Sequence, residues 1–226
     1  MDLDFLDSEV KRINKLYNYC KGIKITVKKP VPVIKDEGFE GDIDIDNLVE
    51  RRNLMCVDVE TSRYGNLIQV SYNIYDPKFR LIKNYDTLID DGIGEIDFFE
   101  KYTLDEIMLC GVSSREAFPI IRDDINGCSH VIGHNIAFDM RKLNDGFEKL
   151  RIPYNKPEQV CTMRSTVNFC KLPSKGKAYK VPKLAELYKI CFGKEPDNTK
   201  THTANYDIEI TFDCFKHLHE KNIIKI

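Results

Sequence analysis

The stretch that most constrains the fold is residues 54–61, which read L-M-C-V-D-V-E-T. It is mostly apolar, contains β-branched residues and lies between the polar residues 51–53 and Gly65, which is the pattern of a buried strand. Because successive side chains on a strand point to opposite faces, Asp58 and Glu60 share one face. Two unpaired carboxylates there would be costly, and hard divalent cations can offset that cost. The alternative, for these residues alone, is an ordinary polar end of a strand.

The composition describes a chain that can build a core around this strand. With 226 residues, 42% of them hydrophobic, it suits one globular domain with an addition. No apolar run approaches the roughly 18 residues of a membrane span, and the acidic N-terminus lacks the features of a secretory signal. The eight cysteines include no C-x-x-C pair. We therefore expect reduced thiols in a cytoplasmic, intracellular protein, with no disulfide framework or zinc site.

Apolar periodicity divides the chain into two parts. In residues 1–53, apolar side chains recur every three or four positions up to Gly22. This predicts one amphipathic helix, and we expect an edge strand after it. Prolines and glycines then interrupt any regular element. We expect this N-terminal extension to pack on the back of the main domain, residues 54–220; the alternative is that it docks a protein partner.

The main domain has the pattern of an α/β unit. Alternating residues predict three consecutive strands with short turns, which form an antiparallel meander. A capping-box pattern at Ser113–Glu116 begins a helix, and short strands then alternate with helices. This order predicts a mixed sheet flanked by helices. We expect strands at 54–61, 68–74, 79–89, 130–133 and 160–162, and further helices at about 135–150, 163–170, 183–191 and 204–220.

Charge is unevenly distributed along the chain. The net charge of −2 does not by itself indicate a partner, but residues 171–200 contain eight lysines and three acids, an excess of five positive charges. Such a stretch is commonly a solvated surface. It also fits contact with a phosphate backbone if it borders an active site.

Two further stretches carry candidate functional residues. Residues 133–139, G-H-N-I-A-F-D, lie where a strand is expected to meet a helix, an edge at which α/β sheets hold ligands. Asp139 falls in the first helical turn, where negative charge is favoured. The alternative is therefore a dipole-stabilising aspartate, with His134 as a cap or core residue. The second stretch, H-T-A-N-Y-D, runs from His202 to Asp207 and opens the last long helix, so both side chains can reach one site.

Together, the three stretches resemble the exonuclease motifs of the DEDDh family, the DnaQ-like 3′→5′ exonucleases with a ribonuclease H-like fold. The motif D-x-E-T matches Asp58–Thr61, H-N-x-x-F-D matches His134–Asp139, and H-x-A-x-x-D matches His202–Asp207. The resemblance covers roughly residues 54–216. It departs from the family at residues 62–65, S-R-Y-G, where the family often continues with T-G.

The resemblance implies an α/β, ribonuclease H-like fold with a mixed five-stranded sheet flanked by helices. It also implies a metal-dependent 3′→5′ exonuclease that releases nucleoside 5′-monophosphates from the 3′ end of single-stranded DNA or RNA. Two Mg²⁺ or Mn²⁺ ions would be held by four acids, with His202 as the general base. The implied metal ligands are Asp58, Glu60, Asp139 and Asp207. The implied contacts of the terminal nucleotide are Thr61, His134, Asn135 and Phe138.

Several alternatives stay open at this point. The protein could instead be a proofreading subunit that docks a polymerase through residues 1–53 or its C-terminus. It could also be a nucleic-acid-binding module without catalysis, although all five motif positions that carry the chemistry hold the expected acid or histidine. Phe138 is as well suited to helix-core packing as to base stacking. No motif discriminates DNA from RNA, because that choice depends on how a pocket treats the 2′-hydroxyl.

Overall fold

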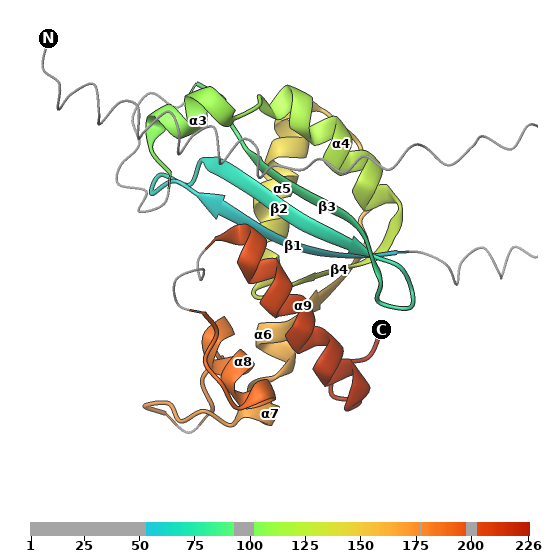
Figure 1. The fold of residues 1–226 in the computed structure, drawn as a ribbon, viewed down its shortest axis with the longest axis vertical. Coiled ribbons are helices and arrows are strands. Elements are labelled where there is room, and N and C mark those ends of the chain that lie inside the picture. Colours follow the sequence, from blue (N-terminus) through green and yellow to red (C-terminus); the bar gives the residue numbers. More distant parts are fainter. Residues whose placement is uncertain (1–52, 93–101, 177, 198–202) are drawn as a thin grey trace, which may run out of the picture.

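The structure, a computed structural model, describes residues 53–92, 102–176, 178–197 and 203–226 (Figure 1). The helix and edge strand predicted for the N-terminal extension, and the candidate base His202, lie outside these ranges. Among the described helices, none combines the length and the apolar character needed to cross a membrane.

A five-stranded mixed sheet with the order β3-β2-β1-β4-β5 is the frame of the domain (Figure 1). Strand β1 pairs antiparallel with β2 and parallel with β4, and β4 pairs parallel with β5. The antiparallel meander and the mixed five-stranded sheet are therefore confirmed. The strands are β1 (Asn53–Thr61), β2 (Leu67–Tyr75), β3 (Leu81–Leu88), β4 (Cys128–Gly133) and β5 (Glu158–Cys161).

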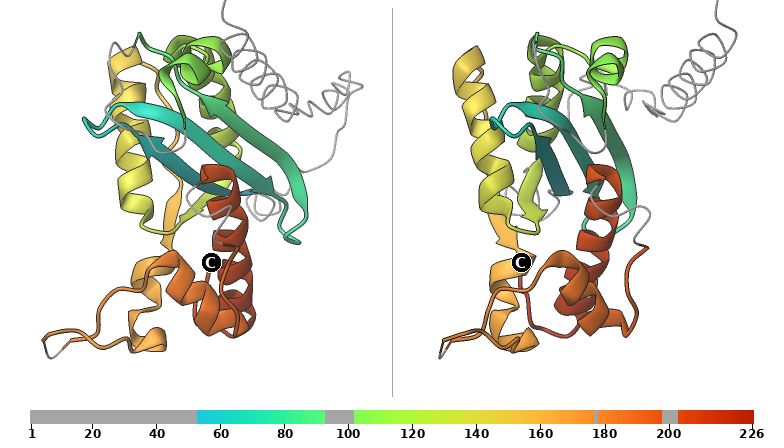
Figure 2. Two further views of the ribbon diagram at one scale, coloured as in Figure 1. Left: turned by 60° about the vertical axis from the view of Figure 1, so that its left-hand side comes forward. Right: turned by 90° about the vertical axis from the view of Figure 1, so that its left-hand side faces the viewer.

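The helices form a layer on each face of the sheet. Helices α4 and α5 cover one face, α9 crosses the other, and α6, α7 and α8 lie beyond the ends of β4 and β5 (Figures 1 and 2). The helices are α3 (Leu104–Cys110), α4 (Ser114–Asn126), α5 (Ile136–Leu150), α6 (Thr162–Ser165), α7 (Val167–Cys170), α8 (Leu184–Phe192) and α9 (Ala204–Glu220).

Strand β1 supplies the core of both layers. Its buried residues Met55, Val57 and Val59 belong to the apolar cluster with α4 and α5. Leu54 and Cys56 point the other way, into the cluster with α8 and α9. Burying each such side chain stabilises the fold by about 1.5–3 kcal/mol, an upper estimate. Because side chains alternate along the strand, the later residues of β1 also lie on alternate faces of the sheet.

Several predicted boundaries are wrong in instructive ways. The third strand begins at Leu81 and not at residue 79, because the carboxylate of Asp76 accepts hydrogen bonds from the backbone N–H groups of Lys78 and Arg80 and extends the turn. The helix expected at 163–170 is two short helices, α6 and α7. The capping box at Ser113–Glu116 is present at the start of α4.

Helix α3 was not predicted. It has only seven residues, too few for a clear apolar period. Its N-terminus carries a capping box in which Thr103 Oγ1 accepts from the N–H of Glu106, and the Glu106 carboxylate accepts from the N–H of Thr103. The T-x-x-E pattern was the signal that sequence reasoning passed over.

The contact between α4 and α5 depends on Gly146. A Cβ on this residue would lie 2.1 Å from Cζ of Phe118, a ring that is fully buried. The same ring meets Phe147 edge-on, with centroids 5.0 Å apart. The two helices can approach this closely only because residue 146 has no side chain.

We expect Gly146→Ala to destabilise the protein by about 1–3 kcal/mol, the usual cost of overpacking a closed core. The gain in helix propensity, about 1 kcal/mol, offsets part of it. Urea unfolding measures the change, with the exposed Glu148→Ala on the same helix as the control. Equal stability of the two variants would contradict the close contact. In a Phe118→Leu background, the cost of Gly146→Ala should shrink.

Candidate metal centre

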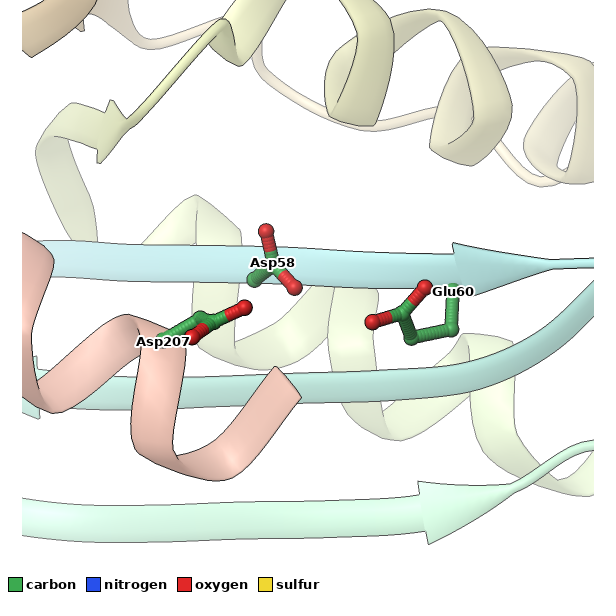
Figure 3. A group of neighbouring side chains, drawn as sticks. All are labelled: Asp58, Glu60 and Asp207. Carbon is green, nitrogen blue, oxygen red and sulfur yellow. The ribbon is translucent and has the colours of Figure 1, made fainter. Parts of the chain in front are cut away.

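Three carboxylates converge where β1 meets the first turn of α9 (Figure 3). Asp58 and Glu60 project from one face of β1, and Asp207 comes from α9 on the same side of the sheet. One oxygen atom of each carboxylate lies within 4.8 Å of an oxygen of each of the other two, and all three residues are half-buried. The structure thus brings together three of the four acids that the motifs predicted.

Apolar packing fixes the position of Asp207. The next residue of α9, Ile208, is fully buried, and its carbonyl oxygen accepts a hydrogen bond from Cys56 Sγ at 3.4 Å. A turn further on, the ring of Phe212 stacks on Tyr75, with centroids 3.4 Å apart. These contacts set the rotation of α9 about its axis. Asp207 therefore faces β1 from the first helical turn, where the helix dipole also favours a negative charge.

The fourth acid, Asp139, occupies a different position next to the same strand. It is outside the group of three oxygens within 4.8 Å. Its Oδ1 accepts a hydrogen bond from the backbone N–H of Val59 at 3.2 Å, and only 3% of the residue is exposed. The pairing of β1 with β4 ends at Cys56, so this N–H has no partner strand. Asp139 satisfies a buried backbone donor that would otherwise be costly.

The electrostatics of this region favour a neutral Asp139. Burial raises its pKa to about 7, and the negative charge of Glu60 adds to the shift, while the hydrogen bonds from the N–H groups of Val59 and Asp139 itself oppose it. A bound divalent cation would favour the charged form and reverse this effect.

The donor set fits a hard divalent cation. The three clustered groups offer carboxylate oxygen alone, which Mg²⁺ and Mn²⁺ prefer, whereas zinc sites are usually built with histidine or cysteine. Asp58, Glu60 and Asp207 would hold such an ion directly, and Asp139 lies beside them. The metal-binding role of the cluster agrees with the prediction from sequence; the ligand set of four acids stays a prediction.

A polar ladder on β2 and β3 borders the cluster and was missed by sequence reasoning. Gln69 pairs with Glu60 and Ser71 with Asp58 across the strands, and both donate hydrogen bonds to the carboxylate of Asp86. The alternation of polar and apolar residues in β2 was visible in the sequence. It did not reveal that Gln69 is 1% exposed and Ser71 0% exposed, because α9 covers their face. Alternation gives the faces of a strand but not what covers them.

The second motif is held by hydrogen bonds on both sides of its histidine. His134 donates from Nε2 to the carbonyl oxygen of Pro182, and its Nδ1 is hydrogen-bonded to Thr162 Oγ1, both at 3.0 Å. Burial lowers the pKa of His134 to about 4, so the ring is neutral at physiological pH. Both ring nitrogens thus have protein partners, and contact with a nucleotide stays a prediction.

The other predicted substrate contacts lie at the same edge. Thr61 ends β1, and Asn135 precedes α5 in a left-handed conformation, with φ of 78°. Phe138 packs partly against the core, and the Arg141 guanidinium lies 5.4 Å from its ring. Packing of Phe138 against the core is thus observed in part, and its stacking on a base stays a prediction. The roles of these residues, and of His202 outside the described ranges, stay predictions.

Asp139 should make the metal-free protein less stable as pH rises. Its folded-state pKa, about 7, lies above the value near 3.9 of an unfolded chain, so folding favours the protonated form. Stability is therefore greatest below about pH 4 for this group and falls as pH rises through 7. In EDTA at pH 8, Asp139→Asn should stabilise by at least about 1 kcal/mol, the worth of nearly one pKa unit, and much less at pH 5. Thermal unfolding at both pH values checks this, with the exposed Asp145→Asn as the control. If Asp139→Asn changes the melting temperature by the same amount at pH 5 and pH 8, the prediction is contradicted.

Comparison with known proteins identifies the fold but not a family. No protein-family model matches the chain, and no curated protein matches it. The structure is similar to E. coli exonuclease I in complex with a dA16 oligonucleotide, with a TM-score of 0.59 and 14% identity, over 76% of this chain and 42% of that one. For the complex with a dT13 oligonucleotide the TM-score is 0.59 and the identity 15%, over 74% and 41%.

A product-bound structure of exonuclease I gives a TM-score of 0.55 and 13% identity, over 76% of this chain and 45% of that one. The chain thus spans less than half the length of these exonuclease I chains. At such identities the likeness concerns the fold alone. The chain thus has a ribonuclease H-like fold, a mixed five-stranded sheet flanked by helices, as the sequence predicted.

Proposed function

We propose that this protein is a metal-dependent 3′→5′ exonuclease that shortens single-stranded nucleic acid and releases nucleoside 5′-monophosphates. The observation that carries the proposal is the cluster of Asp58, Glu60 and Asp207 within 4.8 Å, on a fold similar to exonuclease I. The similar structures hold dA16 and dT13 oligonucleotides, which favours single-stranded DNA as the first substrate to test.

In this proposal the four acids form the metal site. Asp58, Glu60 and Asp207, with Asp139 beside them, hold two Mg²⁺ or Mn²⁺ ions, which when bound stabilise charge on the attacking and leaving oxygens. The Val59–Asp139 hydrogen bond fixes the start of α5 against β1, so that the second motif and the first keep their relative positions. The half-buried setting of the cluster strengthens its electrostatic interactions relative to those in water.

His202 is the proposed general base. Histidine has an unperturbed pKa near 6.5, so its neutral form predominates at physiological pH and can accept the proton of the attacking water. It precedes Asp207 by five positions in the sequence. Thr61, His134, Asn135 and Phe138 are the proposed surroundings of the terminal nucleotide.

The central experiment uses matched 5′-labelled DNA and RNA strands. We expect a ladder of products that shorten by one nucleotide per step, in Mg²⁺ or Mn²⁺ and not in excess EDTA. A 3′-phosphate should block or slow the reaction, because a free 3′ end is what the proposed pocket accepts. A circular single strand is the control and should stay intact. Internal cuts in the circle, or full turnover in EDTA, would contradict the proposal.

Asp207→Asn should lower kcat by about 10²–10⁴-fold, because a ligand that helps supply several kcal/mol of charge stabilisation is lost. The fold should persist, since the substitution keeps the shape of the side chain. The matched control is Asp213→Asn, an exposed acid of the same helix, which should keep its activity. Steady-state kinetics and circular dichroism of both variants measure the two effects. A fully active Asp207→Asn enzyme would rule out this cluster as the catalytic centre.

A further inference from the structure

The segment between α7 and α8 has no role in the function proposed so far. Residues 171–183, which we call the lysine loop, contain five lysines and no acidic residue. The described part of the loop, 171–176 and 178–183, projects from the short helices at the lower end of the molecule (Figures 1 and 2). So dense a positive charge fits contact with a negatively charged partner.

The lysine loop is closed by its own hydrogen bonds. The N–H of Lys180 donates to the carbonyl oxygen of Leu172 at 3.1 Å, and the hydroxyl of Ser174 donates to the carbonyl oxygen of Ala178. The N–H of Gly176 donates to Ser174 Oγ at 3.1 Å. These bonds hold the two sides of the loop together, and Lys171, Lys175 and Tyr179 are exposed on it.

The side chains that it presents suit a single nucleic-acid strand. Lys171 and Lys175 are exposed, and neither has a carboxylate partner within the described part of the chain. Lys180, by contrast, is paired with Glu186 at 2.5 Å. Tyr179 is 47% exposed, an aromatic face among cations. Single-strand binders combine basic side chains that follow the backbone with aromatic rings that stack on bases.

One end of the loop is attached at the edge of the sheet that holds the metal centre. The buried Pro182 receives the hydrogen bond from His134 Nε2, and His134 belongs to the motif that leads into Asp139. Because β1, β4 and β5 are parallel, their C-terminal ends meet at this same edge. The C-terminal end of the lysine loop is therefore anchored at the edge where the cleaved end of a strand would lie, and the rest of the loop extends away from it.

We propose that the lysine loop contacts the sugar–phosphate backbone of the single strand on the 5′ side of the nucleotide being removed, with Lys171 and Lys175 facing phosphates. This inference rests on the proposed function, because it needs the 3′ end in the metal centre. His134 is then a positioning residue, which connects the loop to the catalytic edge. A strand of a few nucleotides would not reach the loop, whereas a longer strand would.

The test compares two double variants of the full chain. Lys171→Gln with Lys175→Gln removes two exposed charges of the loop. Lys78→Gln with Lys156→Gln removes two exposed charges at the opposite edge of the sheet, before β3 and β5, and serves as the control. Binding of 5′-fluorescein-labelled dT20 and dT4 is followed by anisotropy over a range of salt, in an Asp207→Asn background that prevents degradation. Both double variants are also assayed for cleavage in the protein that retains Asp207.

The loop variant should lower the slope of log affinity against log salt for dT20 by about 1.4, because each phosphate contact on a single strand contributes roughly 0.7. KM for dT20 should rise about tenfold at moderate salt, with little change in kcat and no change for dT4. The control pair should behave like the wild type. If the loop variant matches the control in slope and KM, the inference is overturned while the exonuclease proposal stands.

Failure of the proposed function has a different signature. In that case the wild type shortens neither strand, and the proposal falls on the cleavage assay. The binding experiment still tests the role of the loop. If the slope of log affinity against log salt decreases only in the loop variant, the loop is a strand-binding surface; an unchanged slope overturns this role.

Discussion

The hydrogen bond from the Val59 N–H to Asp139 is the interaction on which the arrangement of the site depends. Pairing between β1 and β4 stops at Cys56, while β1 continues to Thr61. A buried strand edge with open backbone donors is costly, and Asp139 closes it from the first turn of α5. The same bond places a buried carboxyl beside Glu60. The chain thus satisfies its backbone with a carboxyl group whose charged form is disfavoured at that position.

The candidate metal centre therefore places mutually repelling carboxylates in an otherwise well-packed fold. The apolar clusters on both faces of β1 are buried, whereas the α9 face of the sheet carries carboxylates, Gln69 and Asp86 in the same layer. Burial raises the pKa of Asp86 despite its hydrogen bonds from Ser71 and Gln69. Packing energy from α4, α5 and α9 therefore supports a polar patch that would not be stable alone.

The convergence of the acids could be predicted from the sequence because it follows from two simple periods. Alternation along β1 places Asp58 and Glu60 on one face, and the apolar period of α9 turns Asp207 toward them. What could not be predicted depends on layers that only the folded chain defines. The polar residues of β2 look solvent-facing in sequence, yet α9 covers them, and the seven residues of α3 are too few to show a period. Asp139 was expected among the metal ligands, and its bond to a backbone donor of β1 follows from where β4 stops, which no local pattern reports.

His134 shows how one half-buried side chain can join two parts of the proposed site. A neutral imidazole has one donor and one acceptor, and here the donor serves Pro182 while the acceptor serves Thr162. The ring therefore ties the start of α5, the start of α6 and the end of the lysine loop into one unit. Protonation would turn its acceptor into a second donor, and the depressed pKa, near 4, keeps that from happening at physiological pH. A structural role and a role toward substrate are therefore compatible for this histidine. By holding the end of the loop in place, the half-buried ring would set the path of a strand without touching it.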